Sequence, residues 1–326
     1  MILSPDERRF ISQNWNQSDY ITHFISNQNS KTHMNSRNII PQAAHRAMAA
    51  LLLLCAIPCT TMQAGSLIRV LQFNIRLISS SDGNNNWYYR AEDVAAYCHD
   101  IQPDMFGMQE VTPAQKTFME KTMTEYACIG LGRDGGSSGE HCPVFYLKSK
   151  YALENSGTFW LSDTPEKVSN TWGAACRRIV TWTILRDKQT GERFCYANTH
   201  FDHKNESARD KSSRLTKERL AQYAEGLPII ITGDFNCTPT STCYTRMIEP
   251  DGTFPMHEAW RDARVKEGIE GTFHSWGTIA LAKRNRIDFI FVTPDIKVLR
   301  CVTDDGSKRP RYLSDHDTVY ADMELP

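Results

Sequence analysis

The pattern of apolar positions predicts buried strands whose ends carry polar side chains. The clearest run covers residues 229–232, follows Pro228 and leads into Gly233, Asp234 and Asn236. A β-branched run of this kind is typical of a buried strand. In an extended chain Asp234 and Asn236 point to the same face, because side chains alternate along a strand. The run therefore predicts a strand that brings a carboxylate and a carboxamide to one edge of a sheet, although an ordinary Asx turn gives the same residues.

Five other apolar runs carry a polar cluster at one end. Three of these runs end at a cluster, and two begin after one. In chain order the six clusters are Asn74, Gln109-Glu110, Asn198-Thr199-His200, Gly233-Asp234-Phe235-Asn236, Ile287-Asp288 and Ser314-Asp315-His316. If all six meet at one edge, four strands arrive there and two leave, so the sheets must contain antiparallel neighbours. This disfavours an all-parallel doubly wound fold.

The segments between these runs predict helices and loops. Apolar positions recur at helical spacing in residues 87–99, 113–123 and 205–226. On the longest helix, Ala208 and Leu215 are predicted to face the core, while basic residues such as Lys217 face solvent among acidic ones. Residues 130–139 are rich in glycine but lack the Gly-Lys-Ser/Thr ending of a phosphate-binding P-loop, so a mobile loop is predicted there.

The ordered set of six clusters resembles the motifs of the endonuclease/exonuclease/phosphatase superfamily. This superfamily includes deoxyribonuclease I, abasic-site endonucleases, neutral sphingomyelinases and inositol-polyphosphate 5-phosphatases, and the resemblance runs from about Leu67 to the C-terminus. It implies an α/β (α+β) four-layered sandwich, in which two mixed, mostly antiparallel β-sheets pack face to face and are flanked by helices. Residues 73–76, 157–162 and 198–203 are most similar to secreted bacterial members.

The distribution of the clusters predicts one catalytic domain. Candidate site residues extend from Asn74 to His316, so one site needs both ends of residues 65–326. A hydrophobic content of 40% is ample for a core, and a mean hydropathy of −0.47 excludes a polytopic membrane protein.

Residues 1–64 are predicted to be a leader outside that domain. Residues 34–64 have the layout of a signal peptide, with basic residues, an apolar core too short to span a bilayer, and a predicted cut after Ala64. If Met34 is the true start, residues 1–33 lie upstream of it. A lipoprotein anchor is disfavoured, because neither cysteine of this segment lies in a small-residue context. We therefore predict export to the periplasm or the extracellular space.

Charge and cysteine content limit the partners. Without residues 1–64 the chain keeps 32 basic and 35 acidic residues, a net charge of −3. This balance does not indicate a polyanion-binding surface, so nucleic acid is a less favoured partner than a small phosphorylated substrate. No stable membrane insertion and no protein partner are implied. Eight cysteines remain, an even number that permits disulfides in an exported protein without revealing their pairing.

The clusters supply what hydrolysis of a phosphate ester needs, namely a hard cation, an activated water and a proton for the leaving group. Oxygen ligands without cysteine point to Mg²⁺ or Mn²⁺, with Ca²⁺ also compatible, rather than to zinc. The resemblance implies that Glu110 is the principal metal ligand. Asp315 is a second candidate ligand, and Asn74 is expected to hold metal or phosphate.

The other cluster residues are assigned to phosphate and proton chemistry. Asp234 is placed to orient or deprotonate the attacking water, and Asn236 to hold phosphate or metal. His316 would polarise a phosphate oxygen, with Asp288 fixing its tautomer. His200 is the candidate for protonating the leaving oxygen or stabilising the transition state.

Two arginines are candidates for substrate binding. Arg178 directly precedes the apolar run 179–182, where a guanidinium could bind a phosphate oxygen bidentately. A salt-bridged surface pair of Arg177 and Arg178 is equally consistent with the sequence. Arg76 follows the first cluster and is assigned to the same task.

These observations predict a secreted, metal-dependent hydrolase that cleaves a phosphate ester by attack of an activated water. A phosphatase acting on a small, sugar-like phosphate is favoured. The alternatives are a secreted endonuclease or exonuclease, a sphingomyelinase-like phosphodiesterase and, outside enzymes, a catalytically inactive binding module of the same fold. The complete polar set argues against the inactive module, because decay of activity would leave gaps in it.

Overall fold

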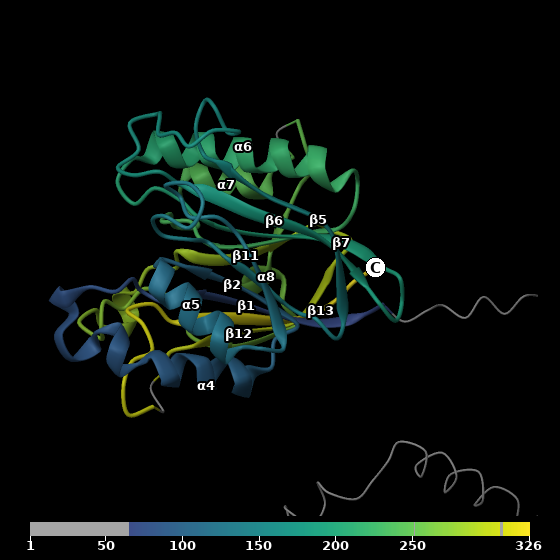
Figure 1. Cartoon of the computed structure of the whole chain (residues 1–326). Helices are drawn as coiled ribbons and strands as arrows, with labels where there is room; N and C mark the ends of the chain where they lie inside the picture. Colours follow the sequence, from purple (N-terminus) through teal and green to yellow (C-terminus); the bar gives the residue numbers. More distant parts are fainter. Residues whose placement is uncertain (1–64, 251, 307–308) are drawn as a thin grey trace, which may run out of the picture. The chain divides into compact units, whose positions relative to one another are not determined.

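The structure is a computed structural model that describes residues 65–326 apart from residues 251, 307 and 308. Two β-sheets pack face to face, and helices cover their outer faces (Figure 1). This arrangement confirms the predicted four-layered sandwich with two mixed sheets. The predicted leader, residues 1–64, lies outside the described residues. Within the described part, every helix is too short or too polar to cross a membrane.

The first sheet has seven strands in the order β10-β12-β13-β1-β2-β4-β3. Its central strand β1 pairs in parallel with β2 and antiparallel with β13. The strands of this sheet are β1 (Leu67–Asn74), β2 (Met105–Gln109), β3 (Tyr126–Ile129), β4 (Val144–Leu147), β10 (Val265–Gly268), β12 (Lys297–Asp304) and β13 (Thr318–Glu324).

The second sheet has six strands in the order β5-β6-β7-β8-β11-β9. Strands β7 and β8 are parallel, and the other neighbours are antiparallel. The strands of this sheet are β5 (Tyr151–Trp160), β6 (Ile179–Asp187), β7 (Arg193–His200), β8 (Ile229–Asp234), β9 (His257–Glu258) and β11 (Asp288–Val292).

The helices cover one outer face of each sheet (Figure 1). Helices α4 and α5 pack on the first sheet through a core that includes Phe73 and Phe106, and α6 and α7 pack on the second around Phe235 and Phe291. A third core fills the space between the sheets. The helices are α4 (Ala91–Ile101), α5 (Pro113–Thr122), α6 (Glu206–Ala224), α7 (Thr242–Ile248) and α8 (Ala259–Asp262), with short 3-10 helices η2 (Ser80–Asn85), η3 (Trp87–Tyr89) and η4 (Leu281–Lys283).

The direction of the strands agrees with the six polar clusters. Strands β1, β2, β7 and β8 end at clusters, and β11 and β13 begin at or after them. Four strands therefore arrive at one end of the two sheets and two leave it, as the sequence predicts. Helix α5 begins at Pro113, behind a capping box in which Thr112 and Gln115 exchange hydrogen bonds. The predicted helix over residues 87–99 is instead η3 followed by α4.

Lys217 corrects the prediction for α6. Its side chain is buried, and its ammonium group donates to the backbone carbonyls of Arg246, at 3.1 Å, and of Glu249. These carbonyls lie at the end of α7, where unpaired carbonyls and the helix dipole attract a cation. Leu215 is only partly buried, because small polar residues such as Ser213 form the face that meets α7.

A chain of buried amides joins the two sheets below the end where the clusters meet. Gln109 donates through its side chain to Gln72 at 2.6 Å and to Asn198 at 2.7 Å, which links β2 to β1 and to β7. Gly107 permits this close approach, because a Cβ at that position would lie 2.5 Å from Oδ1 of Asn198. The amides fix the spacing of the strands that carry the clusters.

Candidate active site

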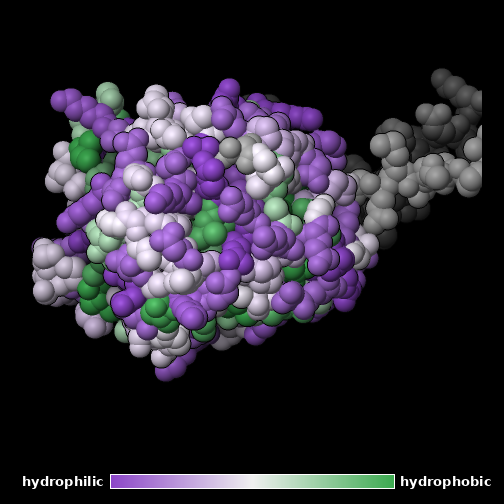
Figure 2. Space-filling view, turned by 90° about the horizontal axis from the view of Figure 1, so that it is seen from above, coloured by the Kyte–Doolittle hydropathy of each residue, from purple (hydrophilic) through white to green (hydrophobic). Residues whose placement is uncertain are grey.

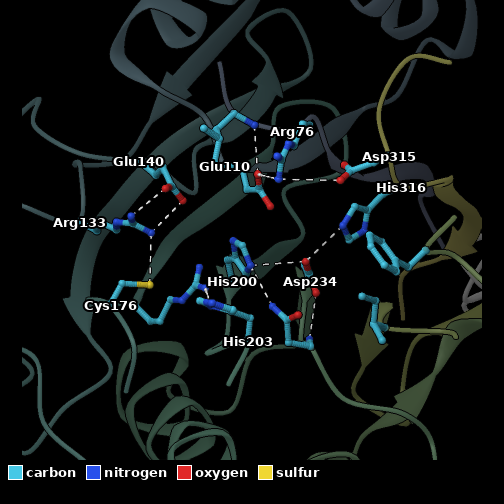
Figure 3. Close-up of a pocket in the computed structure, with 15 residues that line it drawn as sticks. Arg76, Glu110, Arg133, Glu140, Cys176, His200, His203, Asp234, Asp315 and His316 are labelled. Atoms are coloured by element: carbon cyan, nitrogen blue, oxygen red, sulfur yellow. Dashed lines mark hydrogen bonds and ion pairs between the residues drawn. The ribbon is translucent and has the colours of Figure 1, made fainter. Parts of the chain in front are cut away.

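All six polar clusters meet around a cavity of about 460 Å³ (Figure 3). Asn74 and Asp288 lie behind its lining, and each hydrogen-bonds to a lining residue. The other predicted site residues line the cavity itself: Arg76, Glu110, Arg178, His200, Asp234, Asn236, Asp315 and His316. The structure therefore brings together all the residues that the sequence selected.

The strand register sets the centre of the site. His200 at the end of β7 lies opposite Asp234 at the end of β8, and Asp234 lies opposite Asp288 at the start of β11. Residues opposite one another in a sheet point to the same face, so these three side chains form a row. His316, from the segment before β13, completes the group, which is called the strand edge below.

His316 is held by Asp288. Its Nδ1 lies 2.8 Å from Oδ2 of Asp288, whose other oxygen accepts a hydrogen bond from Gln72 at 2.7 Å. Burial alone would lower the pKa of His316, but the carboxylates of Asp288, Asp234 and Asp315 together outweigh burial and raise that pKa well above its ordinary value. This shift favours the imidazolium form of His316, whose Nε2 lies at the cavity 3.8 Å from Oδ2 of Asp234.

Asp234 is the buried carboxylate at the centre of the row. One of its oxygens accepts from the backbone N–H of Asn236 at 2.9 Å, and the other accepts from the Asn74 side chain at 3.0 Å. Burial, reinforced by the negative charge of Asp288, raises the pKa of Asp234 to about 7. A carboxylate with a pKa near 7 is suited to accept a proton from water at neutral pH.

His200 is neutral in this environment. Burial, together with the positive charge of Arg178, lowers the pKa of His200 well below its ordinary value. The Asn236 amide donates to the backbone carbonyl of Phe201 at 3.1 Å, and the same nitrogen lies 3.0 Å from Nε2 of His200. A neutral imidazole that accepts from Asn236 is a weak acid. The geometry therefore favours a positioning contact in the transition state over the alternative role as proton donor.

The oxygen atoms at the cavity fit a divalent cation. Ligand atoms of Glu110, His200 and Asp234 lie within 4.8 Å of one another, and two of the three residues are carboxylates. A hard cation prefers such oxygen donors. Ligand atoms of Asp234, Asp288 and His316 form a second group of this kind, but the imidazolium there already supplies the positive charge. The first group is the better candidate for a metal site.

Arg76 balances the carboxylates on the far side of this group. Its guanidinium lies 3.8 Å from Glu110 and 3.9 Å from Asp315, and it pairs with Asp82 at 3.1 Å. Asp315 therefore faces the cavity close to Glu110, as expected of a second ligand. Three carboxylates engage Arg76, so charge balance describes its contacts better than the predicted substrate binding.

Asn74 has a different contact pattern from the one that a metal ligand needs. Its carboxamide oxygen accepts from the backbone N–H of Arg76 at 3.0 Å, which leaves the nitrogen to face the cavity. That nitrogen donates to Glu110 at 3.1 Å and to Asp234 at 3.0 Å. Asn74 thus orients the two carboxylates that would hold a metal.

The two neighbouring arginines have separate environments. Arg177 pairs with Asp134 at 2.9 Å on the surface, whereas Arg178 is buried in the cavity wall. Arg178 contacts Nδ1 of His203 at 3.1 Å, and its Nε has no hydrogen-bond partner among the described residues. A buried guanidinium that lines a cavity is suited to bind an anion.

The sequence did not single out the wall opposite His316 and Asp315. This wall, called the loop wall below, consists of Arg133, Glu140, Cys176 and His203 (Figure 3). Arg133 and Glu140 form an ion pair of 2.7 Å at the base of the glycine-rich segment, whose backbone hydrogen bonds make a hairpin-like loop. The available signals were His203, which ends the motif 198–203, and Cys176, whose segment was expected to flank the site.

Cys176 and His203 also lie close to Asp202, but their arrangement does not indicate a second metal site. The oxygens of Asp202 accept from the backbone N–H groups of Ala175, at 2.8 Å, and of Asn205, at 2.8 Å. His203 meanwhile faces the cation Arg178. These contacts brace the loops after β7 and before β6.

Comparisons with known proteins agree with this geometry. The family described as "Endonuclease/Exonuclease/phosphatase family" matches residues 71–316. The solved structure of an endonuclease/exonuclease/phosphatase from Bacteroides vulgatus is 39% identical, with a TM-score of 0.77, and the match covers 80% of this chain and 100% of that chain. A mannosyl-6-phosphatase from Bacteroides thetaiotaomicron is 30% identical, with a TM-score of 0.72, over 79% of this chain and 100% of that chain.

More distant relatives are the nocturnins. The protein from Drosophila melanogaster is 23% identical over 82% of this chain and 48% of its own length. This chain therefore spans about half the length of the curated relatives that it matches. The extent of the family match, the fold and the assembled clusters lead to one conclusion: this chain belongs to the endonuclease/exonuclease/phosphatase family, whose members are metal-dependent phosphoester hydrolases.

Proposed function

We propose that this protein is a phosphomonoesterase that removes phosphate from a small, hydroxyl-rich molecule and uses Mg²⁺ or Mn²⁺. The observation that carries the proposal is the cavity, because a volume of about 460 Å³ suits one small ligand. The strand edge lines one side of it, and the buried arginine Arg178 lies beside His200. The similarity to a mannosyl-6-phosphatase supports the same substrate class.

The residues of the strand edge and Glu110 divide the reaction between them. Glu110 and Asp234 would hold a divalent cation, which would supply positive charge that offsets the charge of the phosphate. Asp234 accepts a proton from the attacking water, and His316 donates a hydrogen bond from Nε2 to a phosphate oxygen. The water oxygen bonds to phosphorus as the ester P–O bond breaks, and the alkoxide takes up a proton from solvent. The products are an alcohol and inorganic phosphate.

The loop wall is placed to contact the alcohol. The side chains of Arg133 and Glu140 are 21% and 19% exposed, so both reach the cavity while they remain paired. A carboxylate accepts hydrogen bonds from hydroxyl groups, and a guanidinium donates to them. A hydroxyl-rich leaving group satisfies both, whereas an apolar one leaves a partly buried pair desolvated.

The surface supports a small substrate over a polymer or a bilayer. On the face seen in Figure 2, hydrophobic side chains are scattered among hydrophilic ones. A membrane-active phosphodiesterase calls for a contiguous apolar patch, and a nuclease calls for clustered basic side chains beside the site. Of the three arginines that line the cavity, Arg76 and Arg133 are each paired with a carboxylate.

A substrate screen tests the proposal. Sugar phosphates, an aryl phosphate, a bis-aryl phosphodiester, plasmid DNA and sphingomyelin are each incubated with Mg²⁺ or Mn²⁺. We expect phosphate release from at least one sugar phosphate and weak or no cleavage of DNA. Efficient plasmid nicking at physiological salt without phosphomonoesterase activity would instead favour the nuclease, and a chain inactive on every substrate would favour the binding module.

We also propose that the chain is exported and cut after Ala64, because residues 34–64 have the layout of a signal peptide. Mass analysis of protein from the periplasm and medium tests this. A mature form that begins at Gly65 is the expected result. A form that keeps residues 34–64 and stays inside the cell would contradict the proposal.

A further inference from the structure

Two cysteines flank the loop that follows the site residue Asn236. Cys237 lies directly after Asn236, and Cys243 lies in the first turn of α7. Their sulfur atoms are 3.0 Å apart, closer than the ~3.5–4.0 Å at which non-bonded atoms ordinarily pack. Both side chains are buried, at 4% and 0% exposure. The two thiols therefore already face each other inside the core under α6.

The backbone between the two cysteines is also closed. The backbone N–H and the hydroxyl of Ser241 both donate to the carbonyl of Thr238, at 3.0 and 2.6 Å, so the intervening residues form a tight turn. On the other side, the hydroxyl of Ser213 in α6 lies 3.2 Å from the sulfur and 3.2 Å from the carbonyl oxygen of Cys243. A disulfide requires cysteines whose side chains converge without backbone movement, and the 3.0 Å between the two sulfurs shows that these side chains converge.

We propose that Cys237 and Cys243 form an intramolecular disulfide that fixes the loop after Asn236 to α7. The inference is independent of the proposed substrate, because it rests on the position of the two sulfurs. It assigns one pair among the eight cysteines of residues 65–326, whose many possible pairings the sequence leaves open.

Thiol–disulfide exchange with a small-molecule disulfide accounts for the oxidation. The thiolate of Cys237, the more exposed of the two, attacks one sulfur of the oxidant and expels a thiolate. Cys243 then loses its proton and attacks the sulfur of Cys237, which expels the second thiolate. The protein loses two protons and two electrons, and the oxidant becomes two thiols. Since both cysteines are buried in the folded chain, the exchange is expected to occur during folding, in an oxidising compartment.

The cross-link has a direct consequence for the site. Asn236 is in the left-handed region with φ of 49°, a conformation that costs energy for a residue other than glycine. In that conformation its side chain contacts both His200 and the carbonyl of Phe201. A covalent bond at the next residue restrains the chain, so the disulfide helps to keep Asn236 in place.

Peptide mapping of the full chain tests the pairing. The protein is equilibrated with oxidised glutathione while it refolds, and free thiols are alkylated in denaturant before digestion with trypsin. Cleavage after Arg219 and Arg246 releases residues 220–246, which contain only these two cysteines. We expect this peptide to lack two hydrogen atoms and to carry no alkyl group. A doubly alkylated peptide, or one joined to another peptide, would refute the proposal.

Thermal unfolding tests the effect on the loop. The oxidised protein should melt about 5 °C above the same protein treated with a phosphine reductant, as expected for a cross-link that closes a short loop. The matched control is the double variant Cys237→Ala with Cys243→Ala, in which the reductant should cause no such shift. If the disulfide is mapped but the melting temperature does not respond to reductant, its restraint of the loop is refuted. The mapping result stands even if the double variant does not fold.

Discussion

The two sides of the cavity differ in how the chain builds them. In the strand edge, His200, Asp234 and Asp288 are fixed by the register of β7, β8 and β11, and His316 is held by its contact with Asp288. The loop wall consists of side chains from the segments between strands, held by pairs such as Arg133 and Glu140. Under the proposed function, chemistry common to all phosphate esters resides on the strand edge, and contacts specific to one alcohol reside on the side whose length and sequence can vary.

Metal removal should cause the largest loss of turnover, because the expected metal ligands lie on the strand-edge side of the cavity and not in the loop wall. Excess EDTA should abolish turnover, and Mg²⁺ or Mn²⁺ should restore it, since Glu110 and Asp234 would otherwise face the phosphate as bare carboxylates. Circular dichroism of the chelated protein controls for unfolding. Full turnover in excess chelator would disprove the assignment of a metal to this edge.

Substitutions in the strand edge should have the next largest effect. Asp234→Asn and His316→Gln should each lower kcat by roughly 10²-fold or more, because proton transfer and stabilisation of charge are each typically worth that much. Glu166→Gln is a matched control, since Glu166 pairs with Arg219 on the surface away from the cavity. Near-normal kcat in both site variants, with metal affinity intact, would show that the active site lies elsewhere.

Substitution in the loop wall should affect one substrate class only. Glu140→Gln should raise KM for a sugar phosphate by about tenfold, since a hydrogen bond to a charged group contributes ~1.5–3 kcal/mol. The KM for an aryl phosphate, which offers no hydroxyl groups, should stay within about twofold. Asp134→Asn in the same loop is the control, because Asp134 pairs with Arg177 outside the cavity. An equal rise in KM for both substrates would show that the loop wall does not contact the alcohol part of the substrate.

The stability of the metal-free protein should depend on pH through the strand edge. The pKa values of Asp234, at about 7, and of His316 are both raised in the folded state. The folded state therefore binds protons that the unfolded state releases, and stability should fall as pH rises through 7, by at most ~1.4 kcal/mol per pH unit for each group. Thermal unfolding in EDTA between pH 4 and 9 measures this slope, to which Asp234 contributes below pH 7 and His316 above its ordinary pKa of 6.5. The Asp234→Asn variant should show a shallower slope, and an unchanged slope would contradict the assignment.

The fold and the strand edge could be predicted because both follow from local patterns. Apolar runs set the strands, and the polar residue that ends or begins each run marks where the strand meets the site. His200, Asp234 and Asp288 were accessible in this way, since a strand end is visible in the sequence. The orientation of Asn74 could not be predicted in this way, because the direction of its carboxamide depends on the backbone of Arg76.

The loop wall and the burial of Lys217 depend on contacts between distant segments. Arg133 and Glu140 look like ordinary surface residues until the hairpin-like loop folds over the cavity. Lys217 has the periodicity of an exposed residue, but the end of α7 supplies carbonyls that accept from its ammonium group. Arg177 and Arg178 differ only in which face of the chain they occupy before β6, and the sequence carries no signal for that choice.

The register of β8 also limits where residues can be inserted in this chain without loss of the site. Because side chains alternate along a strand, one inserted residue in β8 would turn Asp234 away from both His200 and Asp288 at once. Insertions in the segment between Gly130 and Gly139 leave that register untouched. Length variation among descendants should therefore accumulate in the glycine-rich segment, where it would alter which alcohol is accepted without altering how the phosphate is cleaved.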